Sequence, residues 1–381
     1  MRGRIMTTLG ELKRGAAKLL DSVPYQQVKD SPSIKYYTDW SAFETCSPGE
    51  PLRYELDAQV IIRDGRLAKN EVGAVELGED DALPINTIDL RESKMLLKHL
   101  LNVPSVVFID VPPGAGKLGV LVESSGGSFE SSHVLINVRD GASVDLSIIE
   151  LGGTCSSNVV EALVGRGAQV NLLNASLQGG NPAYGLSRIT ALDNAVINGY
   201  TVVLDGSMNR REEDYLLRGN YSSVSSKVLE TGTAKSRIDY YSTLLHIGES
   251  TRSYSTVSGI ALDGSMVIHR GMGRITETGK WSSTVVEGKM FMGSRDAVAV
   301  SVPVIAVDTG DVSEARHSAM DASIDEEQMF YLASRGLSRE EVIGLVAHDM
   351  VMKYLDEAPK QFSEEIQLIK SIMAERLLRA R

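Results

Sequence analysis

Hydrophobic and polar positions alternate over much of the chain. From about residue 57, short segments place an apolar side chain at every second position, which is the spacing of a β-strand with one buried face. The segment RDGASVDLSII is typical, and DAVAVSVPVIAVD alternates most strictly. In these two segments the apolar residues are Ala142, Val144, Leu146 and Ile148, and Val298, Val300, Val302 and Val304. The pattern predicts a chain rich in short strands.

The alternating segments recur at a near-constant interval. Each opens with a Gly, Asn or Asp turn and a small residue, so that Ala168 follows Ala142 by 26 positions and Ala195 comes 27 positions later. Strands that recur at a fixed period without helices between them favour a solenoid, because a small residue at each corner lets the coils stack closely. A β-sandwich also consists of short strands and is the alternative. We favour a mainly β protein with a parallel β-helix core.

Helical patterns flank this strand-rich region. Residues 7–20 have apolar side chains at helical spacing. The last strand is expected to end near Asp308, and Ser338 with Glu341 then forms a capping box that begins a helix. The predicted organisation is an N-terminal helical region (residues 1–56), a parallel β-helix core (57–316) and a C-terminal helical domain (317–381).

Charge and composition argue against several classes of function. The chain has 39 Lys and Arg against 50 Asp and Glu, and no cluster of basic residues, which argues against a nucleic-acid binder. No stretch reaches the roughly 18 apolar residues of a membrane span. The basic N-terminal residues precede no apolar secretory segment. We therefore expect a cytoplasmic protein.

The two cysteines, Cys46 and Cys155, stand far apart and outside any Cys-x-x-Cys pair. This spacing excludes a disulfide framework and a four-cysteine metal site made by this chain alone. Two lone thiols suit a reducing cytosol. We expect Cys155 to be a buried thiol in the strand ladder, with passage of sulfur along the β-helix as the alternative, and Cys46 to be incidental in a polar loop.

Three motifs that carry chemistry in other proteins are weak here. The segment PPGAGKL looks like a phosphate-binding loop, but Val111 and Leu118 replace the glycine and the hydroxyl residue that such a loop needs. Glu212, Glu213 and Asp214 are adjacent, so their side chains would diverge in a strand, and we expect a solvated loop rather than a calcium-dependent polysaccharide-cleaving site. The Gly-x-Ser-x-Gly motif of many hydrolases is missing from the sequence.

One of the six histidines differs from the others. His317 follows the last expected strand. Charged Glu314 and Arg316 precede it, and small Ser318 and Ala319 follow it. A side chain at such a junction can face a neighbouring molecule, so His317 is either a ligand or a junction histidine without one. The remaining five lie within strand or helix patterns and are expected to be structural, namely His99, His133, His246, His269 and His348.

Segments near the C-terminus make the chain similar to the SufB/SufD family, the scaffold subunits of the SUF iron–sulfur cluster assembly machine. These segments are RSYSTVSGIALDGSMVIHRGMGRI, VEGKMFMGSRDAVAVSVPVIAVD and HSAMDASIDEEQMFYLASRGLSREEV, with HIGESTRS just upstream. The run IDEEQMFYLASRGLS is the most specific. The match covers residues 240–350 and is looser over 100–240. The resemblance implies a right-handed parallel β-helix flanked by helical domains and a non-catalytic scaffold function.

The resemblance also implies partners. Two such chains pair through the end strands of their β-helices, which here means the valine strand from 298 to 304. The ABC-type ATPase SufC, which carries the ATPase activity, docks on the C-terminal helices, here through Phe330, Tyr331 and Arg335. SufB-type chains carry a cysteine in the strand that reads RDAVAVSVP here and a glutamate at the position of Ser318. This chain lacks both and is therefore SufD-like.

These residues leave a deficit of cluster ligands. Iron–sulfur clusters are held mostly by cysteine thiolates, with histidine as an occasional ligand. His317, with Glu314 as a weaker candidate, cannot hold a cluster alone, so a transient cluster would be shared with a SufB-like chain or with a second copy. Two alternatives stay open: a purely structural partner subunit without a ligand, and a β-helix carbohydrate-active enzyme.

Overall fold

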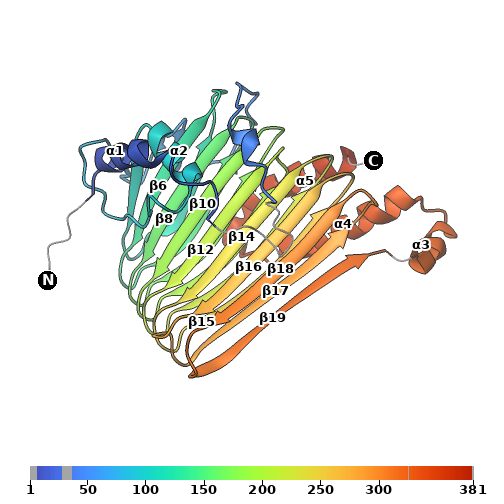
Figure 1. The fold of residues 1–381 in the computed structure, drawn as a ribbon. Helices are drawn as coiled ribbons and strands as arrows, with labels where there is room; N and C mark the ends of the chain where they lie inside the picture. The colour runs from blue at the N-terminus through green and yellow to red at the C-terminus, as the bar shows by residue number, and fades with distance from the viewer. Residues whose placement is uncertain (1–6, 28–36, 325, 380–381) are drawn as a thin grey trace.

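The chain coils through two long, mainly parallel sheets that form the body of the molecule (Figure 1). The computed structural model describes residues 7–27, 37–324 and 326–379. From β4 (Val106–Val111) onward, successive strands along the chain fall alternately in the two sheets, and each strand from β6 (Glu130–Val138) to β17 (Ser282–Met292) pairs in parallel with the strand two places earlier and the strand two places later. This is the topology of a parallel β-solenoid, which confirms the predicted fold class.

The strands are of similar length through most of the solenoid. The ten-stranded sheet contains, in spatial order, β2 (Arg66–Asn70), β1 (Val60–Arg63), β5 (Gly116–Glu123), β7 (Ser143–Leu151), β9 (Gln169–Leu177), β11 (Val196–Leu204), β13 (Ser223–Gly232), β15 (Arg252–Ala261), β17 (Ser282–Met292) and β19 (Val312–Ser323). The nine-stranded sheet contains β3 (Val75–Leu77), β4 (Val106–Val111), β6 (Glu130–Val138), β8 (Ser156–Val164), β10 (Ala183–Ala191), β12 (Asn209–Leu217), β14 (Arg237–His246), β16 (Met266–Ile275) and β18 (Val298–Val307).

The period of the sequence sets the register of the rungs. Val170 pairs with Val144 on one side and with Ile197 on the other, so similar side chains stack along the solenoid axis. These residues belong to a buried cluster of Val, Ile, Leu and Ala side chains that fills the interior. The corner residues Ala142 and Ala168 are almost fully buried. A larger side chain at either position would disturb the close stacking of adjacent rungs.

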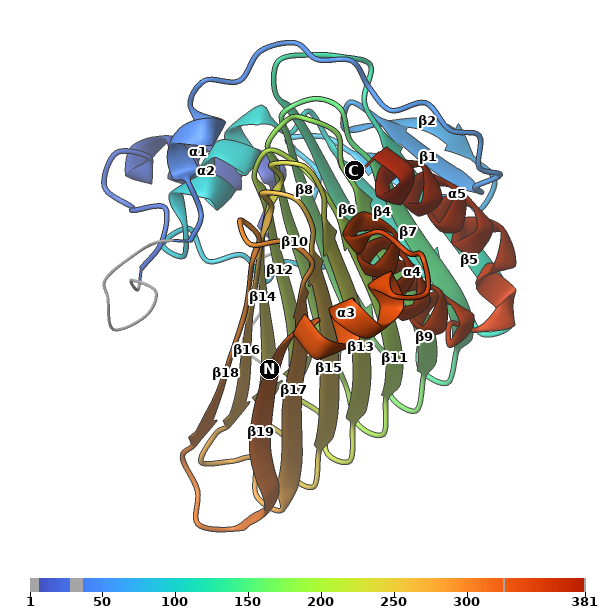
Figure 2. The ribbon, with the colours of Figure 1, turned by 90° about the vertical axis from the view of Figure 1, so that its right-hand side faces the viewer.

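The N-terminal helices cover part of the outer face of the nine-stranded sheet (Figure 2). The helix predicted over residues 7–20 is confirmed as α1 (Leu9–Leu19), which begins with a capping box between Thr8 and Glu11. A second helix, α2 (Lys94–Asn102), is capped by the side chain of Ser93. A short 3-10 turn, η1 (Trp40–Phe43), follows α1 along the chain.

The C-terminal helices cover part of the outer face of the ten-stranded sheet (Figure 2). They are α3 (Glu326–Ala333), α4 (Arg339–Asp356) with the predicted Ser338–Glu341 capping box, the 3-10 turn η2 (Lys360–Phe362) and α5 (Ser363–Arg379). The Tyr354 hydroxyl lies within hydrogen-bond distance of the Thr201 carbonyl oxygen (2.9 Å), and the Ser147 hydroxyl donates to buried Glu365 (2.7 Å). These contacts fix α4 and α5 on the sheet.

The strands continue further than the sequence pattern predicted. The prediction that they end near Asp308 is wrong, because β19 runs to Ser323. Its sequence, VSEARHSAMDAS, lacks a run of large apolar residues, and all twelve residues are exposed. A strand without a covering layer needs no apolar face, which is why the alternation rule missed it. The division into domains at residue 316 stays a prediction.

The two cysteines lie together. Cys46 and Cys155 form a disulfide, with their Cα atoms 5.7 Å apart and 109 positions between them in sequence. The prediction of two separate thiols is therefore wrong. The chain after η1 crosses back over a corner of the solenoid to reach β1, and this long-range approach leaves no mark in the local sequence. No described helix is both long and apolar enough to cross a membrane.

Candidate functional site

The solenoid ends in an open rung made of β18 and β19. Each of these strands pairs on one side only, β18 with β16 and β19 with β17, and no other described strand meets their free edges (Figure 1). The free edges therefore present unpaired backbone donors and acceptors, which is a template for a further strand. Exposed large apolar side chains gather on this rung, namely Val298, Val304, Val307, Val312 and Met320.

His317 lies in the middle of this rung. It does not follow the last strand, as the sequence suggested, but lies within β19 directly opposite Val286 of β17. The row continues through Ser255 and Ser226, and all three partners of His317 in this row are almost fully buried. Residues in register share one face of a sheet. His317 thus occupies an inward-facing position that would be interior in any earlier rung but is exposed here.

Glu314, the weaker ligand candidate, is not brought together with His317. An odd number of positions separates the two residues, so they face opposite sides of β19. The Glu314 carboxylate instead accepts an ion-pair contact from Arg316 at 2.8 Å. Asp321, which the sequence analysis did not single out, shares the face of His317, but it lies four positions further along the strand. At about 3.3 Å per residue, that is too far for both side chains to bind one small ion.

Behind His317, buried polar groups approach the open rung from the interior. His269 lies inside the solenoid, and its Nδ1 is 2.9 Å from the hydroxyl oxygen of Ser301 on β18. Burial lowers the pKa of His269 to about 3, so this imidazole is neutral at neutral pH. Its ring packs near Tyr240, whose hydroxyl donates to Glu213. His269 was predicted to be structural, and its full burial agrees with that expectation.

The other strand histidines are held by polar partners inside the fold. His246 has Thr251 Oγ1 at 2.7 Å from Nδ1 and Ser253 Oγ at 2.8 Å from Nε2, and burial lowers its pKa to about 4. His133 contacts Glu161 at 3.0 Å and the ring of His99. With both nitrogens engaged, His246 has no free position for a ligand. Only His348, on α4, and His317 are exposed among the six.

The acidic trio is buried rather than solvated, so the prediction of a loop is wrong. Glu212, Glu213 and Asp214 lie in β12, where alternation sends Glu213 into the solenoid and the other two to its outer face. Asp214 accepts from Arg188 at 2.7 Å, and Glu212 accepts from Arg210 at 2.9 Å. The partners of Asp214 and Glu213, Arg188 and Tyr240, lie on other strands, and local sequence does not show them.

The predicted interface valines lie on β18, with part of their surface on the outer face of the nine-stranded sheet. Val302 and Val304 line a cavity of about 390 Å³ together with Tyr241, Arg270 and Met272. Val298 and Val304 are 43% and 42% exposed, whereas Val300 and Val302 are half-buried. The structure therefore brings the four valines to the edge of the open rung, and their contact with another chain stays a prediction.

The predicted ATPase-docking residues are exposed, with Phe330 and Tyr331 on α3 and Arg335 in the turn that follows it. Phe330 and Tyr331 are 76% and 58% exposed, and the Arg335 guanidinium lies 5.2 Å from the ring centre of Tyr331. In Figure 1, α3 lies beyond the end of β19, away from the solenoid body. Exposed aromatic residues next to one another are typical of contact surfaces. Asp325, which belongs to the most specific sequence motif, lies outside the described residues.

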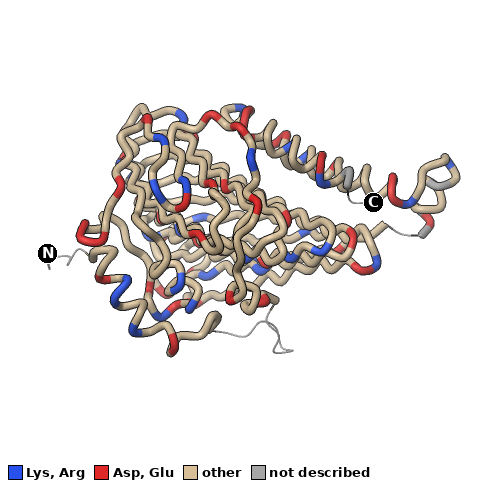
Figure 3. The backbone as a smooth tube through the Cα atoms, turned by 90° about the horizontal axis from the view of Figure 1, so that it is seen from above, with Lys and Arg blue, Asp and Glu red and all other residues tan. Residues whose placement is uncertain are grey.

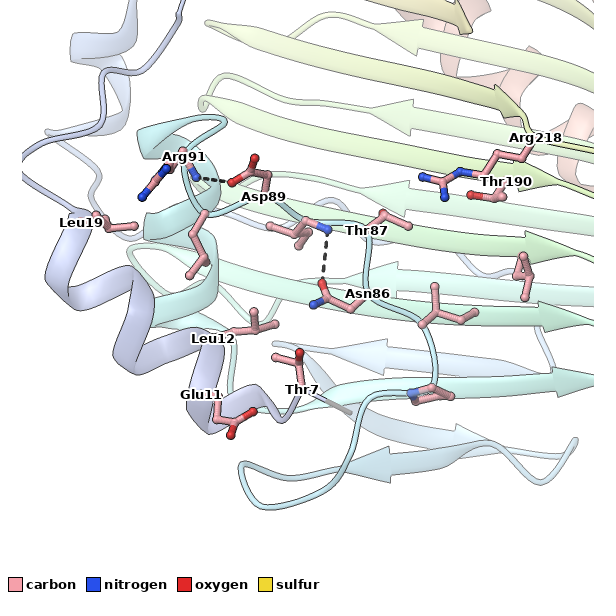
Figure 4. Close-up of a pocket in the computed structure, with 15 residues that line it drawn as sticks. Thr7, Glu11, Leu12, Leu19, Asn86, Thr87, Asp89, Arg91, Thr190 and Arg218 are labelled. Atoms are coloured by element: carbon pink, nitrogen blue, oxygen red, sulfur yellow. Dashed lines mark hydrogen bonds between the residues drawn. The ribbon is translucent and has the colours of Figure 1, made fainter. Parts of the chain in front are cut away.

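A cavity of about 740 Å³ lies far along the solenoid from His317, between α1, residues 84–91 and the nine-stranded sheet (Figure 4). Its walls combine Leu12 and Glu11 from α1 with Thr190 and Arg218 from the sheet side. Asn86 and Asp89 turn their carboxamide and carboxylate oxygens to backbone N–H groups of their own loop. The lining is mixed in charge and polarity and indicates no particular ligand.

The chain by itself offers no complete metal site among its described residues. No group of three or more His, Cys, Asp or Glu side chains is placed to hold a metal ion there. Both thiols are joined in the disulfide, far from the open rung. The PPGAGKL segment is a turn between β4 and β5, with a strand instead of the helix that a phosphate loop requires. Acidic and basic residues are interspersed along the backbone (Figure 3).

Comparison with known proteins decides the family. The sequence profile described as "SUF system FeS cluster assembly, SufBD core domain" matches residues 121–350, which includes most of the solenoid, the open rung and α3. This chain belongs to the SufBD family. The match agrees with the resemblance inferred from the C-terminal segments.

Individual relatives support the same assignment. The iron–sulfur cluster assembly protein SufD of Bacillus subtilis is 25% identical over 281 residues, which cover 68% of this chain and 60% of the relative. SufBD family proteins of Synechocystis and Staphylococcus saprophyticus are 29% identical over 142 residues and 24% identical over 252 residues. These two matches cover 37% and 64% of this chain, and 29% and 53% of the relatives. The chain thus matches less than two thirds of the length of each relative. The likeness to a protein named SufD makes this a SufD-like member.

Proposed function

We propose that this chain is a non-catalytic scaffold subunit for iron–sulfur cluster assembly. It pairs through its open rung with a SufB-like chain or with a second copy, and it contributes His317 to a transient cluster that the two chains share. The ABC-type ATPase SufC docks on its C-terminal helices, and the assembly works in the cytoplasm. The observation that carries this proposal is a solenoid end that the described chain leaves open, with an exposed histidine in an inward-facing position.

The donor set supports sharing. Cluster iron prefers thiolate ligands, and the open rung supplies one imidazole and no thiol. A second chain that adds its own strands to the free edges of β18 and β19 would place its side chains next to His317. The cluster is therefore cargo held between two chains, and this chain supplies a minority of its ligands.

The position of α3 supports a role for the ATPase at the same end of the molecule. The chain passes from His317 along β19 and within a few residues enters α3, where Phe330 and Tyr331 are exposed. A partner that binds these aromatic residues can shift the end of β19 when it changes conformation. Movement driven by ATP hydrolysis would then reach the cluster site through a short, continuous segment.

A purely structural partner subunit is the second candidate, and the missing thiols favour it. In that case the open rung serves only for pairing. A carbohydrate-active enzyme has less support, because the acidic residues of β12 are all engaged, Asp214 and Glu212 by arginines and Glu213 by Tyr240.

The test compares His317→Ala with His348→Ala, an exposed histidine on α4, in a complex co-expressed with a SufB-like chain and a SufC-like ATPase. We expect both variants to co-purify with the partners. After anaerobic reconstitution, we expect His317→Ala to lose more than about twofold in iron and acid-labile sulfide, because a ligand is missing. Normal loading of His317→Ala would leave only the structural role.

Pairing is tested separately with a charge on the edge strand. We expect Val304→Lys to abolish co-purification with the SufB-like chain, because a buried unpaired ammonium opposes association. Val75→Lys is the matched control, since Val75 is 49% exposed on β3 at the opposite edge of the same sheet. If both variants still bind the partner, pairing does not use the edge of β18.

A further inference from the structure

The disulfide joins the solenoid to a segment that crosses one of its corners. Cys155 lies directly before β8 and is fully buried, whereas Cys46 is half-buried at the start of the crossing segment. After Cys46 the chain runs over the corner loops and enters β1 at Val60. The proposed scaffold function gives no role to Cys46 or Cys155. The disulfide between them therefore needs a separate explanation.

The crossing segment touches the corner mainly through backbone atoms. The Leu52 N–H donates to the Gly152 carbonyl oxygen at 2.8 Å. A Cβ atom on Gly49 would lie 2.2 Å from the Gly153 carbonyl oxygen, and one on Gly153 would lie 2.3 Å from the Glu50 carbonyl oxygen. Only glycine allows this approach. The sequence repeats a glycine pair at three successive rungs of this corner, at 126–127, 152–153 and 179–180.

The same segment also supports the C-terminal helices. Leu52, Tyr54 and Leu56 pack against the apolar cluster that α4 and α5 form with the ten-stranded sheet. The Tyr54 hydroxyl lies 3.4 Å from a carboxylate oxygen of Glu375 on α5. Residues 47–57 are therefore a bridge between the solenoid corner and α5, and the disulfide is the covalent anchor at the N-terminal end of this bridge.

We propose that Cys46 and Cys155 form a redox-sensitive clamp that fixes residues 47–57 when oxidised and loosens them, with the adjoining surface of α5, when reduced. The oxidised bond fixes the N-terminal end of the bridge covalently, and after its loss the bridge is held at the corner by non-covalent contacts such as the hydrogen bond from the Leu52 N–H to the Gly152 carbonyl oxygen. In a reducing compartment such a bond is not maintained by default, which makes it responsive to oxidation. The clamp goes beyond the proposed scaffold function and does not depend on a cluster or a partner.

The chemistry balances with a low-molecular-weight disulfide as oxidant. Attack on that disulfide by the Cys46 thiolate, the more accessible of the two, gives a mixed disulfide and releases one small thiol. The Cys155 thiolate then displaces the second small thiol and closes the Cys46–Cys155 bond. Two protein thiols are oxidised, and one disulfide is reduced to two thiols. A dithiol reductant reverses the exchange and becomes a cyclic disulfide.

The test follows trypsin cleavage after Arg53, an exposed residue within the bridge, in the full-length chain equilibrated with oxidised glutathione or with dithiothreitol. We expect reduction to accelerate this cleavage about tenfold, because a loosened segment opens more often to the protease. Cleavage after Lys235, in the exposed turn between β13 and β14, serves as an internal control and should not change. The Cys46→Ser variant should be cleaved rapidly after Arg53 under both conditions.

Thiol counting completes the test. The oxidised chain, unfolded without reductant, should take up no alkylating reagent, and the reduced chain should take up two equivalents. Two reactive thiols after equilibration with oxidised glutathione would show that the bond does not form, and equal cleavage after Arg53 in both states would show that it clamps nothing. Either result overturns the clamp and leaves the scaffold proposal untouched, because neither measurement involves iron, sulfide or another chain.

Discussion

The interior rungs and the terminal rung share one strand repeat, yet they bury their side chains in opposite ways. In β12 seven of nine positions are buried, among them Arg211 and Glu213, whereas all positions of β19 are exposed. β12 is paired by β10 and β14, and β19 is paired by β17 alone. Burial in this fold therefore comes from the neighbouring rungs.

This difference shows what a solenoid needs at its end. A repeat cannot close its own interior, so the final repeat needs a polar cap or a partner. Here β19 is mostly polar, but β18 carries exposed Val298 and Val304, and no described segment covers the pair. An end that is neither sealed nor fully polar is suited to contact with another chain, as the scaffold proposal requires.

The largest expected effect comes from breaking an interior charge pair. The Arg211 guanidinium makes two contacts with Glu150, at 2.7 and 2.8 Å, and fills the space beside Gly185. We expect Arg211→Ala to lower the free energy of unfolding by about 3–5 kcal/mol, since it leaves a buried carboxylate with Asn158 as its remaining partner. Arg316→Ala, on the terminal rung, should cost less than about 1 kcal/mol, because its ion pairs are exposed.

Urea unfolding followed by circular dichroism measures both variants. The double variant Glu150→Gln/Arg211→Met is the control, because removing both charges should recover much of the loss. Equal costs for Arg211→Ala and Arg316→Ala would mean that burial by neighbouring rungs does not set the cost of losing a charged side chain.

The sequence predicted the parts of the fold that depend on local pattern. Alternation and the 26-residue recurrence of small residues such as Ala142 and Ala168 were sufficient for the parallel solenoid, because identical corners must stack. The capping boxes at Thr8 and Ser338 likewise depend on residues three positions apart. These features need no knowledge of distant contacts.

The missed features depend on distant partners. β19 was missed because a strand without a covering layer has no apolar alternation, and Glu213 and Asp214 of β12 were misplaced because Tyr240 and Arg188 on other strands stabilise them. The Cys46–Cys155 pair was missed for the same reason. Of the candidate site, the sequence singled out His317 and the valines of β18, but it placed His317 after the strand instead of within it.

A smaller effect is expected from the interior histidines on acidification. Burial lowers the pKa of His246 to about 4, and an unfolded histidine has a pKa of about 6.5. Between these pH values, His246 therefore binds a proton in the unfolded chain but not in the folded chain. The free energy of unfolding is not reduced by this effect above pH 6.5. It falls by about 3 kcal/mol as the pH decreases towards 4.

Urea midpoints at pH 7 and pH 4.5 test this expectation. His246→Gln should lose less stability on acidification than the wild type, since the imidazole with the lowered pKa is gone. His348→Gln, which changes an exposed histidine on α4, should follow the wild type at both pH values. If His246→Gln also follows the wild type, the acid sensitivity of the fold comes from other groups.

The smallest effect separates backbone conformation from burial. Tyr221 and Trp281 adopt positive φ angles of 58° and 57° at the same corner where Asn194 has 57°. Both are exposed, by 66% and 53%. Asparagine tolerates this conformation better than an aromatic residue. We expect Tyr221→Asn and Trp281→Asn each to raise the free energy of unfolding by about 0.5–1 kcal/mol.

Both gains should be equal, although Tyr221 belongs to an interior rung and Trp281 lies next to the terminal one, because a local backbone preference does not depend on neighbouring rungs. Alanine at either position is the matched control, since it removes the ring without favouring a positive φ, and it should give no gain. A gain at Tyr221 with a loss at Trp281 would instead show that the indole packs against the open end, where the Ser313 hydroxyl already donates to the Trp281 carbonyl oxygen. Trp281 would then belong to the contact surface of the terminal rung, and the difference between the two aromatic residues would measure how far that surface extends along the corner.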